Sequence, residues 1–179
     1  MSTCSTLQTL VRNLSAHGSR PAILAFHRHT LETWSYERLT EAVTGLASGL
    51  VENGLGRGES VGIYSPNRPE WIIACLAVLD AGAVPVPIDS QSAGEDLVHV
   101  IEDCGASRIL TVRPLADRLT ALGLDRDRSI ILLDAGEGDS QSWQRLNGRR
   151  ARKGFPAKPE DQALLFYTSG VSGRPKGVP

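Results

Sequence analysis

The stretch Tyr167–Gly177 constrains this chain more than any other part of its sequence. It follows a short apolar run, Ala163–Phe166, which predicts a buried strand. Three glycines, three Ser or Thr hydroxyl groups and one lysine then lie close together. Glycine lets backbone N–H groups approach an anion closely, hydroxyl groups add donors, and the lysine adds a positive charge. The stretch therefore has the residue types of a polyphosphate-binding loop.

The spacing separates this loop from two common nucleotide-binding loops. A P-loop needs G-x-x-x-x-G-K followed by Ser or Thr, whereas here Gly170, Gly173 and Lys176 are followed by Gly177. The pattern G-x-G-x-x-G is not present in the loop either. A surface turn rich in glycine and serine is the alternative interpretation. The order of strand, hydroxyl pair, paired glycines and Pro-Lys-Gly favours the phosphate site.

Composition limits the size of the fold, the kinds of partner and the cellular compartment that we expect for this chain. The chain has 179 residues, 41% of them hydrophobic, which suffices for one domain with a core or for part of a larger one. A net charge of −1 argues against a nucleic-acid partner. Three cysteines without C-x-x-C spacing favour the reducing cytoplasm. We expect no signal peptide, because the N-terminus has no basic start followed by an apolar core. We also expect no transmembrane segment, because the longest apolar run, Trp71–Leu79, is too short to span a bilayer.

Helical periodicity alternates with short apolar runs along the chain. This pattern predicts an α/β fold with helices layered on a mixed, largely parallel sheet. Between residues 135 and 162 the periodicity fades, which predicts an irregular connector with a short helix near Trp143–Leu146. The expected helices lie near residues 5–17, 33–51, 71–81, 92–101 and 114–122, and the expected strands near 22–26, 31–34, 61–64, 82–89, 108–112, 130–134 and 163–166.

Three local features refine this picture. Pro85 and Pro87 cannot donate ladder hydrogen bonds, so their strand should be irregular or at an edge. Ser92 and Glu95 have capping-box spacing and should begin a helix. His99 lies off the apolar stripe of that helix, which favours an exposed histidine over a general base.

The sequence Tyr-Thr-Ser-Gly-x-x-Gly-x-Pro-Lys-Gly resembles the phosphate-loop signature of the adenylate-forming superfamily, which includes acyl-CoA synthetases, luciferases and nonribosomal-peptide adenylation domains. Members usually carry two threonines where this chain has Val171 and Ser172, so the hydroxyl is kept only at Ser172. The Ala-Gly-Ala-x-x-x-Pro segment at residues 81–87 and Ser-Tyr-x-x-Leu at 35–39 also resemble the family. Three matches in the family's order make the resemblance specific.

The resemblance implies that residues 1–179 are the N-terminal part of an AMP-binding (adenylation) domain, a partial region of an acyl-CoA synthetase-like large domain. The family joins a carboxylic acid to AMP from ATP, with Mg²⁺, and then transfers the acyl group to a thiol, usually that of CoA. The resemblance implies no catalytic residue or metal ligand in this chain, because the family's lie downstream of the phosphate loop. It assigns the β- and γ-phosphates to Thr168, Ser169, Gly170, Val171, Ser172, Gly173 and Lys176.

The partners and the activity stay open between alternatives. Residues 67–71 and 84–87 look most like fatty acyl-CoA synthetases, with a peptide-synthetase adenylation domain as the nearest rival. A non-catalytic phosphate-binding or interaction module is the alternative from another class. We predict that residues 1–179 alone do not catalyse adenylation. We also expect self-association through an uncovered apolar face, which a clean monomer in size-exclusion chromatography at high concentration would contradict.

Overall fold

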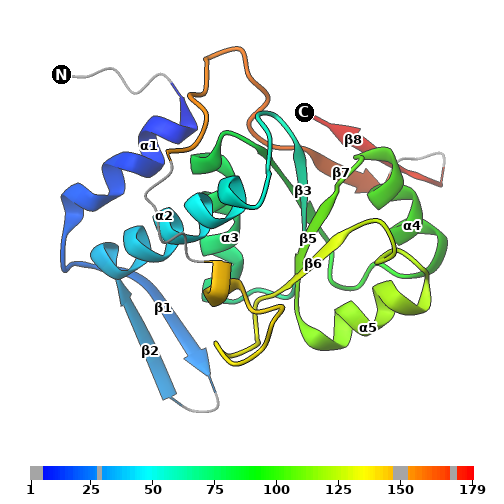
Figure 1. The fold of residues 1–179 in the computed structure, drawn as a ribbon, viewed down its shortest axis with the longest axis horizontal. Helices are drawn as coiled ribbons and strands as arrows, with labels where there is room; N and C mark the ends of the chain where they lie inside the picture. The colour runs from blue at the N-terminus through cyan, green and yellow to red at the C-terminus, as the bar shows by residue number, and fades with distance from the viewer. Residues whose placement is uncertain (1–5, 28–29, 147–152, 170–172) are drawn as a thin grey trace.

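A four-stranded parallel sheet forms the centre of the molecule (Figure 1). The computed structural model describes residues 6–27, 30–146, 153–169 and 173–179. The strand order β4-β3-β5-β6 places the first strand of this sheet, β3, between β4 and β5. The chain therefore adds β4 on one side of β3, then crosses back and adds β5 and β6 on the other side. The strands are β3 (Ser60–Tyr64), β4 (Val84–Ile88), β5 (Arg108–Thr111) and β6 (Ser129–Leu132).

Helices cover both faces of this sheet, which gives the layered α/β architecture that the sequence predicts. Helices α2 and α3 pack on each other at one face, and α4 and α5 lie at the other (Figure 1). Helix α3 is apolar on nearly every side because it is buried, with Ile73, Ala74, Ala77 and Val78 at 0% exposure. The helical elements are α1 (Leu7–Asn13), η1 (Leu14–His17), α2 (Tyr36–Glu52), α3 (Pro69–Ala81), α4 (Gly94–Asp103), α5 (Arg113–Ala121) and η2 (Trp143–Leu146).

The two prolines of β4 lie at the edge of the parallel sheet, as predicted. Leu165 N donates to Pro85 O at 3.2 Å, so the Pro85 peptide faces away from β3. Alternation along a strand turns Pro87 to the same outer side. Both missing N–H groups therefore fall where β3 does not need them.

This edge also explains a wrong prediction. The run Ala163–Phe166 is not a buried strand: residues 163–165 are half-buried without regular pairing, and Phe166 is 49% exposed. The outer side of β4 offers carbonyls but no proline N–H, so the chain beside it cannot form a full ladder. Strand β7 (Phe166–Ser169) begins later and pairs with β8 (Pro175–Val178) in an antiparallel hairpin.

A second antiparallel hairpin, β1 (Pro21–His27) with β2 (Thr30–Ser35), projects from the body of the molecule (Figure 1). Phe26 pairs with Leu31, and Leu24 lies two residues before Phe26, so the three share one face. All three side chains are exposed: Phe26 by 82%, Leu31 by 49% and Leu24 by 63%. The self-association expected from sequence stays a prediction, and this face is where it should be sought.

The start of α4 differs from the capping-box prediction by one residue. The N-cap is Ala93, which makes no side-chain capping bond, and Ser92 lies in the preceding turn. The Ser92 carbonyl accepts hydrogen bonds from Tyr64 Oη at 2.7 Å and from Arg118 at 3.1 Å. These contacts with β3 and α5 hold Ser92 outside the helix.

Candidate functional site

The β7–β8 hairpin presents the described residues of the glycine-rich stretch. In its register Thr168 lies opposite Lys176, and Tyr167 lies opposite Gly177. Directly opposed residues project from the same face of an antiparallel pair, and successive residues alternate. The Thr168 hydroxyl and the Lys176 ammonium group therefore leave one face together, while the Tyr167 ring lies on the other.

The structure places only part of the expected phosphate loop. Thr168 and Lys176 are exposed, and Gly173 has a positive φ of 95° with open space around it. That conformation favours glycine over residues with a side chain. Residues 170–172 and the side chain of Ser169 lie outside what the structure describes, so Gly170, Val171 and Ser172 stay expectations.

The charge on this hairpin is positive and is not neutralised by described neighbours. Arg174 and Lys176 are exposed, and no ion pair within 4.0 Å joins either of them to a carboxylate in the described parts of the chain. An exposed lysine without a carboxylate partner remains available to an anionic ligand. The arrangement can therefore supply hydroxyl and ammonium donors to a phosphate group.

A hollow of about 440 Å³ lies beside the hairpin at the carboxyl ends of β3 and β4. It is lined by Ser65, Asn67, Trp71, Ile88, Asp89 and Phe166, among others. The carboxyl edge of a parallel sheet is where ligands of open α/β folds generally bind. The hairpin thus borders the edge of the sheet that suits a ligand.

The positively charged side chain of Arg118 lies at the end of β3. Arg118 from α5 donates to Tyr64 Oη at 2.8 Å, and Tyr64 Oη donates in turn to the carbonyl of Ser92. Burial raises the pKa of the Tyr64 phenol, and the Arg118 guanidinium partly opposes this rise. Tyr64 therefore stays protonated at neutral pH and ties β3 and α5 to the turn before α4.

Helix α4 contacts both strands of the hairpin through two side chains that the sequence interpretation missed as site residues. Tyr167 Oη donates to Asp103 Oδ2 at 2.5 Å, and His99 Nε2 lies 3.0 Å from the carbonyl oxygen of Pro175. Because a carbonyl only accepts, the His99 ring must donate from Nε2. His99 is half-buried against β8, and the expectation of an exposed histidine is wrong. The spacing i, i+4 of His99 and Asp103 was the available signal.

Metal and thiol chemistry find little support in the described residues. No group of three or more His, Cys, Asp or Glu within the described ranges could hold a metal ion. No step is therefore derived through Mg²⁺. Burial raises the pKa of the Cys75 thiol to about 11 and raises that of Cys104. Both thiols stay protonated at neutral pH.

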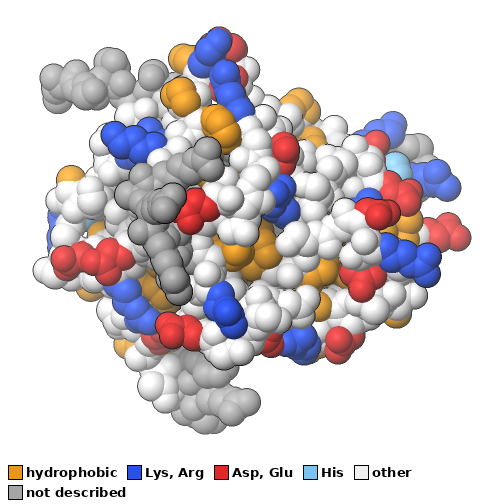
Figure 2. All heavy atoms as spheres, viewed as in Figure 1, with side chains coloured by type: hydrophobic (Ala, Val, Ile, Leu, Met, Phe, Trp, Pro, Cys, Tyr) orange, Lys and Arg blue, Asp and Glu red, His pale blue; other side chains and the backbone are white. Residues whose placement is uncertain are grey.

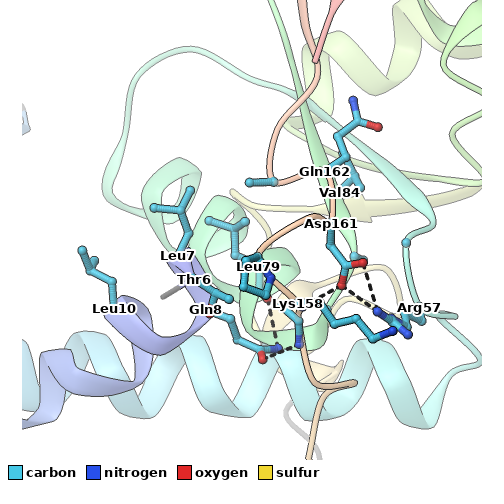
Figure 3. Close-up of a pocket in the computed structure, with 16 residues that line it drawn as sticks. Thr6, Leu7, Gln8, Leu10, Arg57, Leu79, Val84, Lys158, Asp161 and Gln162 are labelled. Carbon is cyan, nitrogen blue, oxygen red and sulfur yellow. Dashed lines mark hydrogen bonds and ion pairs between the residues drawn. The ribbon is translucent and has the colours of Figure 1, made fainter. Parts of the chain in front are cut away.

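Another cavity, of about 570 Å³, lies at the opposite edge of the sheet, between α1 and the segment before β7 (Figure 3). Three of its polar side chains, Gln8, Arg57 and Asp161, already have partners within the protein. Gln8 donates to the carbonyls of Asp80 and Phe155 at 2.9 and 2.7 Å, and its Oε1 accepts from Ala157 N at 2.9 Å. Arg57 binds both carboxylate oxygens of Asp161. We therefore interpret these side chains as stabilising the fold and not as binding a ligand.

The surface carries both charges. Basic and acidic side chains are interspersed on the face drawn in Figure 2. None of the helices in the described ranges has the length and apolar character needed to cross a membrane.

The chain resembles proteins of known function over most of its length. The model of the family described as AMP-binding enzyme matches residues 10–179. Surfactin synthase subunit 2 of Bacillus subtilis is 34% identical over 144 residues, which cover 80% of this chain and 4% of that protein. Feruloyl-CoA synthase of an Amycolatopsis species is 33% identical over 151 residues, 84% of this chain and 29% of that enzyme.

A solved structure has the same fold. The long-chain-fatty-acid–CoA ligase from Archaeoglobus fulgidus superposes with a TM-score of 0.81 at 25% identity, covering 96% of this chain and 35% of that one. The chain thus spans about a third or less of these relatives. The fold and the match over residues 10–179 together place this chain in the AMP-binding enzyme family of adenylate-forming ligases.

Proposed function

We propose that the β7–β8 hairpin holds the β- and γ-phosphates of ATP in an adenylate-forming ligase. The register that sets the Thr168 hydroxyl beside the Lys176 ammonium group on one exposed face carries this proposal. Lys176 supplies counter-charge, and the glycine-rich turn supplies backbone N–H donors. The assigned set is Thr168, Ser169, Gly170, Val171, Ser172, Gly173 and Lys176.

In the proposed reaction, a carboxylate oxygen attacks the α-phosphorus of ATP and the bond to pyrophosphate breaks. A thiol, that of CoA, then displaces AMP from the acyl-adenylate. Two anions must meet in the first step, so holding and neutralising the triphosphate lowers the barrier. The part of this chain is to bind and orient the leaving pyrophosphate. Mg²⁺, expected from the family, would accompany the nucleotide.

A fatty acid with CoA as acceptor is the proposed substrate pair. The likeness to the Archaeoglobus long-chain-fatty-acid–CoA ligase over 96% of this chain supports it. The second candidate is a peptide-synthetase-type adenylation domain, which the 34% identity to surfactin synthase subunit 2 favours. A non-catalytic phosphate-binding module is the third possibility and requires only the hairpin.

Titration with ATP, ADP and AMP tests the phosphate assignment. A site for β- and γ-phosphates binds ATP more tightly than ADP, and ADP more tightly than AMP. Lys176→Gln should weaken ATP about tenfold, equivalent to about 1.4 kcal/mol, and should leave AMP almost unchanged. Lys158→Gln, a lysine beside the opposite cavity, is the matched control. Equal affinity for all three nucleotides would overturn the assignment.

Exchange of labelled pyrophosphate into ATP tests catalysis. The purified 179-residue chain should show no exchange with any carboxylic acid, because the family's adenine and adenylation residues follow the phosphate loop. Turnover by this chain alone would contradict that expectation. In a longer product that carries these residues, exchange stimulated by fatty acids rather than amino acids would support the acyl-CoA synthetase over the peptide-synthetase reading.

A further inference from the structure

The hairpin that bears Thr168 and Lys176 needs outside support to keep its shape. It is a two-stranded sheet with four residues in each strand. Isolated two-stranded hairpins are marginally stable in water, because few backbone bonds oppose a large loss of conformational entropy. A loop that must first be ordered binds more weakly, since the ordering cost is subtracted from the binding energy.

Helix α4 supplies support at both strands. The Tyr167 hydroxyl donates to Asp103, which fixes the residue immediately before Thr168. His99 donates to the Pro175 carbonyl, which belongs to the peptide unit leading into Lys176. The two contacts thus flank the Thr168–Lys176 pair from one helix.

The packing of the hairpin fits this role. Gly177 lies opposite Tyr167, and a Cβ added at Gly177 would lie 3.3 Å from Tyr167 Cζ. The tyrosine ring therefore occupies the space that a larger residue at 177 would fill. Since the Tyr167 face is turned to α4, alternation turns the Thr168 and Lys176 side chains away from the helix. On the other side, α4 is fixed to the core by Leu97, Val100 and Ile101, each at most 3% exposed.

We propose that α4 is the rigid support of the phosphate hairpin, and that His99 and Asp103 are positioning residues that keep Thr168 and Lys176 aligned for a triphosphate. The proposal rests on the proposed function of the hairpin. Neither residue touches the ligand: each acts through the backbone or ring that it holds. Losing either contact leaves the donors in place but lets the hairpin shift relative to the sheet.

Hydrogen exchange and tripolyphosphate binding by the 179-residue chain test the proposal separately from catalysis. Asp103→Leu and Tyr167→Phe should each raise exchange of the hairpin amides about tenfold and weaken tripolyphosphate about threefold to tenfold. Asp103→Asn keeps an acceptor oxygen and should retain most of both properties. His99→Leu should act like Asp103→Leu, and His99→Gln, which keeps a donor, should act like the wild type.

A double-mutant cycle isolates the contact. Tyr167→Phe should have little further effect in the Asp103→Leu background, because the same hydrogen bond is already lost. Glu102→Leu is the matched control: it removes the neighbouring exposed carboxylate of α4, for which no hydrogen bond or ion pair with the described hairpin is found. Thermal unfolding by circular dichroism should give similar Tm values for the Asp103 and Glu102 variants, since both side chains are exposed.

The outcomes are distinct. Unchanged hairpin exchange in Asp103→Leu and His99→Leu would overturn the support by α4. Faster exchange with unchanged tripolyphosphate affinity would overturn the positioning role and leave the proposed function intact. A wild-type chain that binds no tripolyphosphate would overturn the proposed function, and with it the alignment for a ligand. Amide hydrogen exchange would then still show whether α4 holds the hairpin.

Discussion

Thr168 and Lys176 are Cα partners across the β7–β8 hairpin, eight residues apart in the sequence and opposite each other in the register. Their side chains leave one face, while Tyr167 lies over Gly177 on the other. The hairpin therefore separates its two tasks. One face packs toward α4, and the other presents a hydroxyl and an ammonium group to a ligand.

The Thr168 hydroxyl should contribute to triphosphate binding without contributing to the fold. Thr168→Val keeps the branched shape and β propensity but removes one donor. We expect ATP affinity to fall about fivefold, which corresponds to one hydrogen bond of about 1 kcal/mol, with Tm unchanged because the side chain is exposed. Calorimetric titration measures the affinity. An equal loss in Thr168→Ser, which keeps the hydroxyl, would show that the methyl group is responsible.

Gly82 should be far less tolerant of substitution than other glycines with positive φ. Its φ is +78°, and a Cβ there would lie 2.4 Å from the carbonyl oxygen of Phe155. Gly105 has a φ of +63° and nothing within 4 Å, so it reports backbone strain alone. Gly105→Ala should cost about 1–2 kcal/mol, and Gly82→Ala should cost about 1–3 kcal/mol more. Urea unfolding measures both, and equal losses would contradict the close approach of residue 155.

The sequence predicted the sheet and its helices because burial dictates periodicity. Helix α3 is apolar all round and is buried. Pro85 and Pro87 are tolerated in β4 because the strand is at an edge, and only the residues that alternate with the prolines turn their N–H groups to β3. The run Ala163–Phe166 misled because an apolar run does not say what pairs with it. Its neighbour is the proline edge of β4, and pairing starts only where β8 becomes available.

The candidate site was predictable in residue type but not in its support. Thr168 and Lys176 follow from the motif, since the spacing is local. His99 and Pro175 are 76 residues apart, and a histidine beside an apolar stripe gives no sign of which distant carbonyl it will meet. Long-range contacts of this kind depend on how α4 lies on the sheet, which the pattern of a single sequence does not encode.

Gln8 should be a main link between α1 and the segment before β7 (Figure 3). It is 5% exposed and bonds the carbonyls of Asp80 and Phe155 and the N–H of Ala157. Gln8→Leu keeps the volume but leaves these groups unpaired, so unfolding free energy should fall by about 2–4 kcal/mol. Gln162→Leu, at an exposed glutamine, should change it by less than about 0.5 kcal/mol.

Limited proteolysis gives a second measurement of the Gln8 link. Cleavage after Lys153 should be faster in Gln8→Leu than in Gln162→Leu, because the segment near Phe155 and Ala157 loses its attachment to α1. Equal cleavage rates in the two variants would show that Arg57 and Asp161 hold this segment without Gln8.

The Cys75 thiol should make stability depend on alkaline pH. Burial raises its pKa from 9.0 to about 11, so the folded state keeps a proton that the unfolded state loses. This contribution is fully present below about pH 9 and is lost as the pH rises toward 11. The stability advantage of the wild type over Cys75→Ala should therefore shrink by about 1–2 kcal/mol between about pH 8 and about pH 10. Urea unfolding of both proteins measures it, and the Cys104 contribution cancels in the difference. A difference that stays constant with pH would show that the thiol ionises as readily in the folded chain as in the unfolded one.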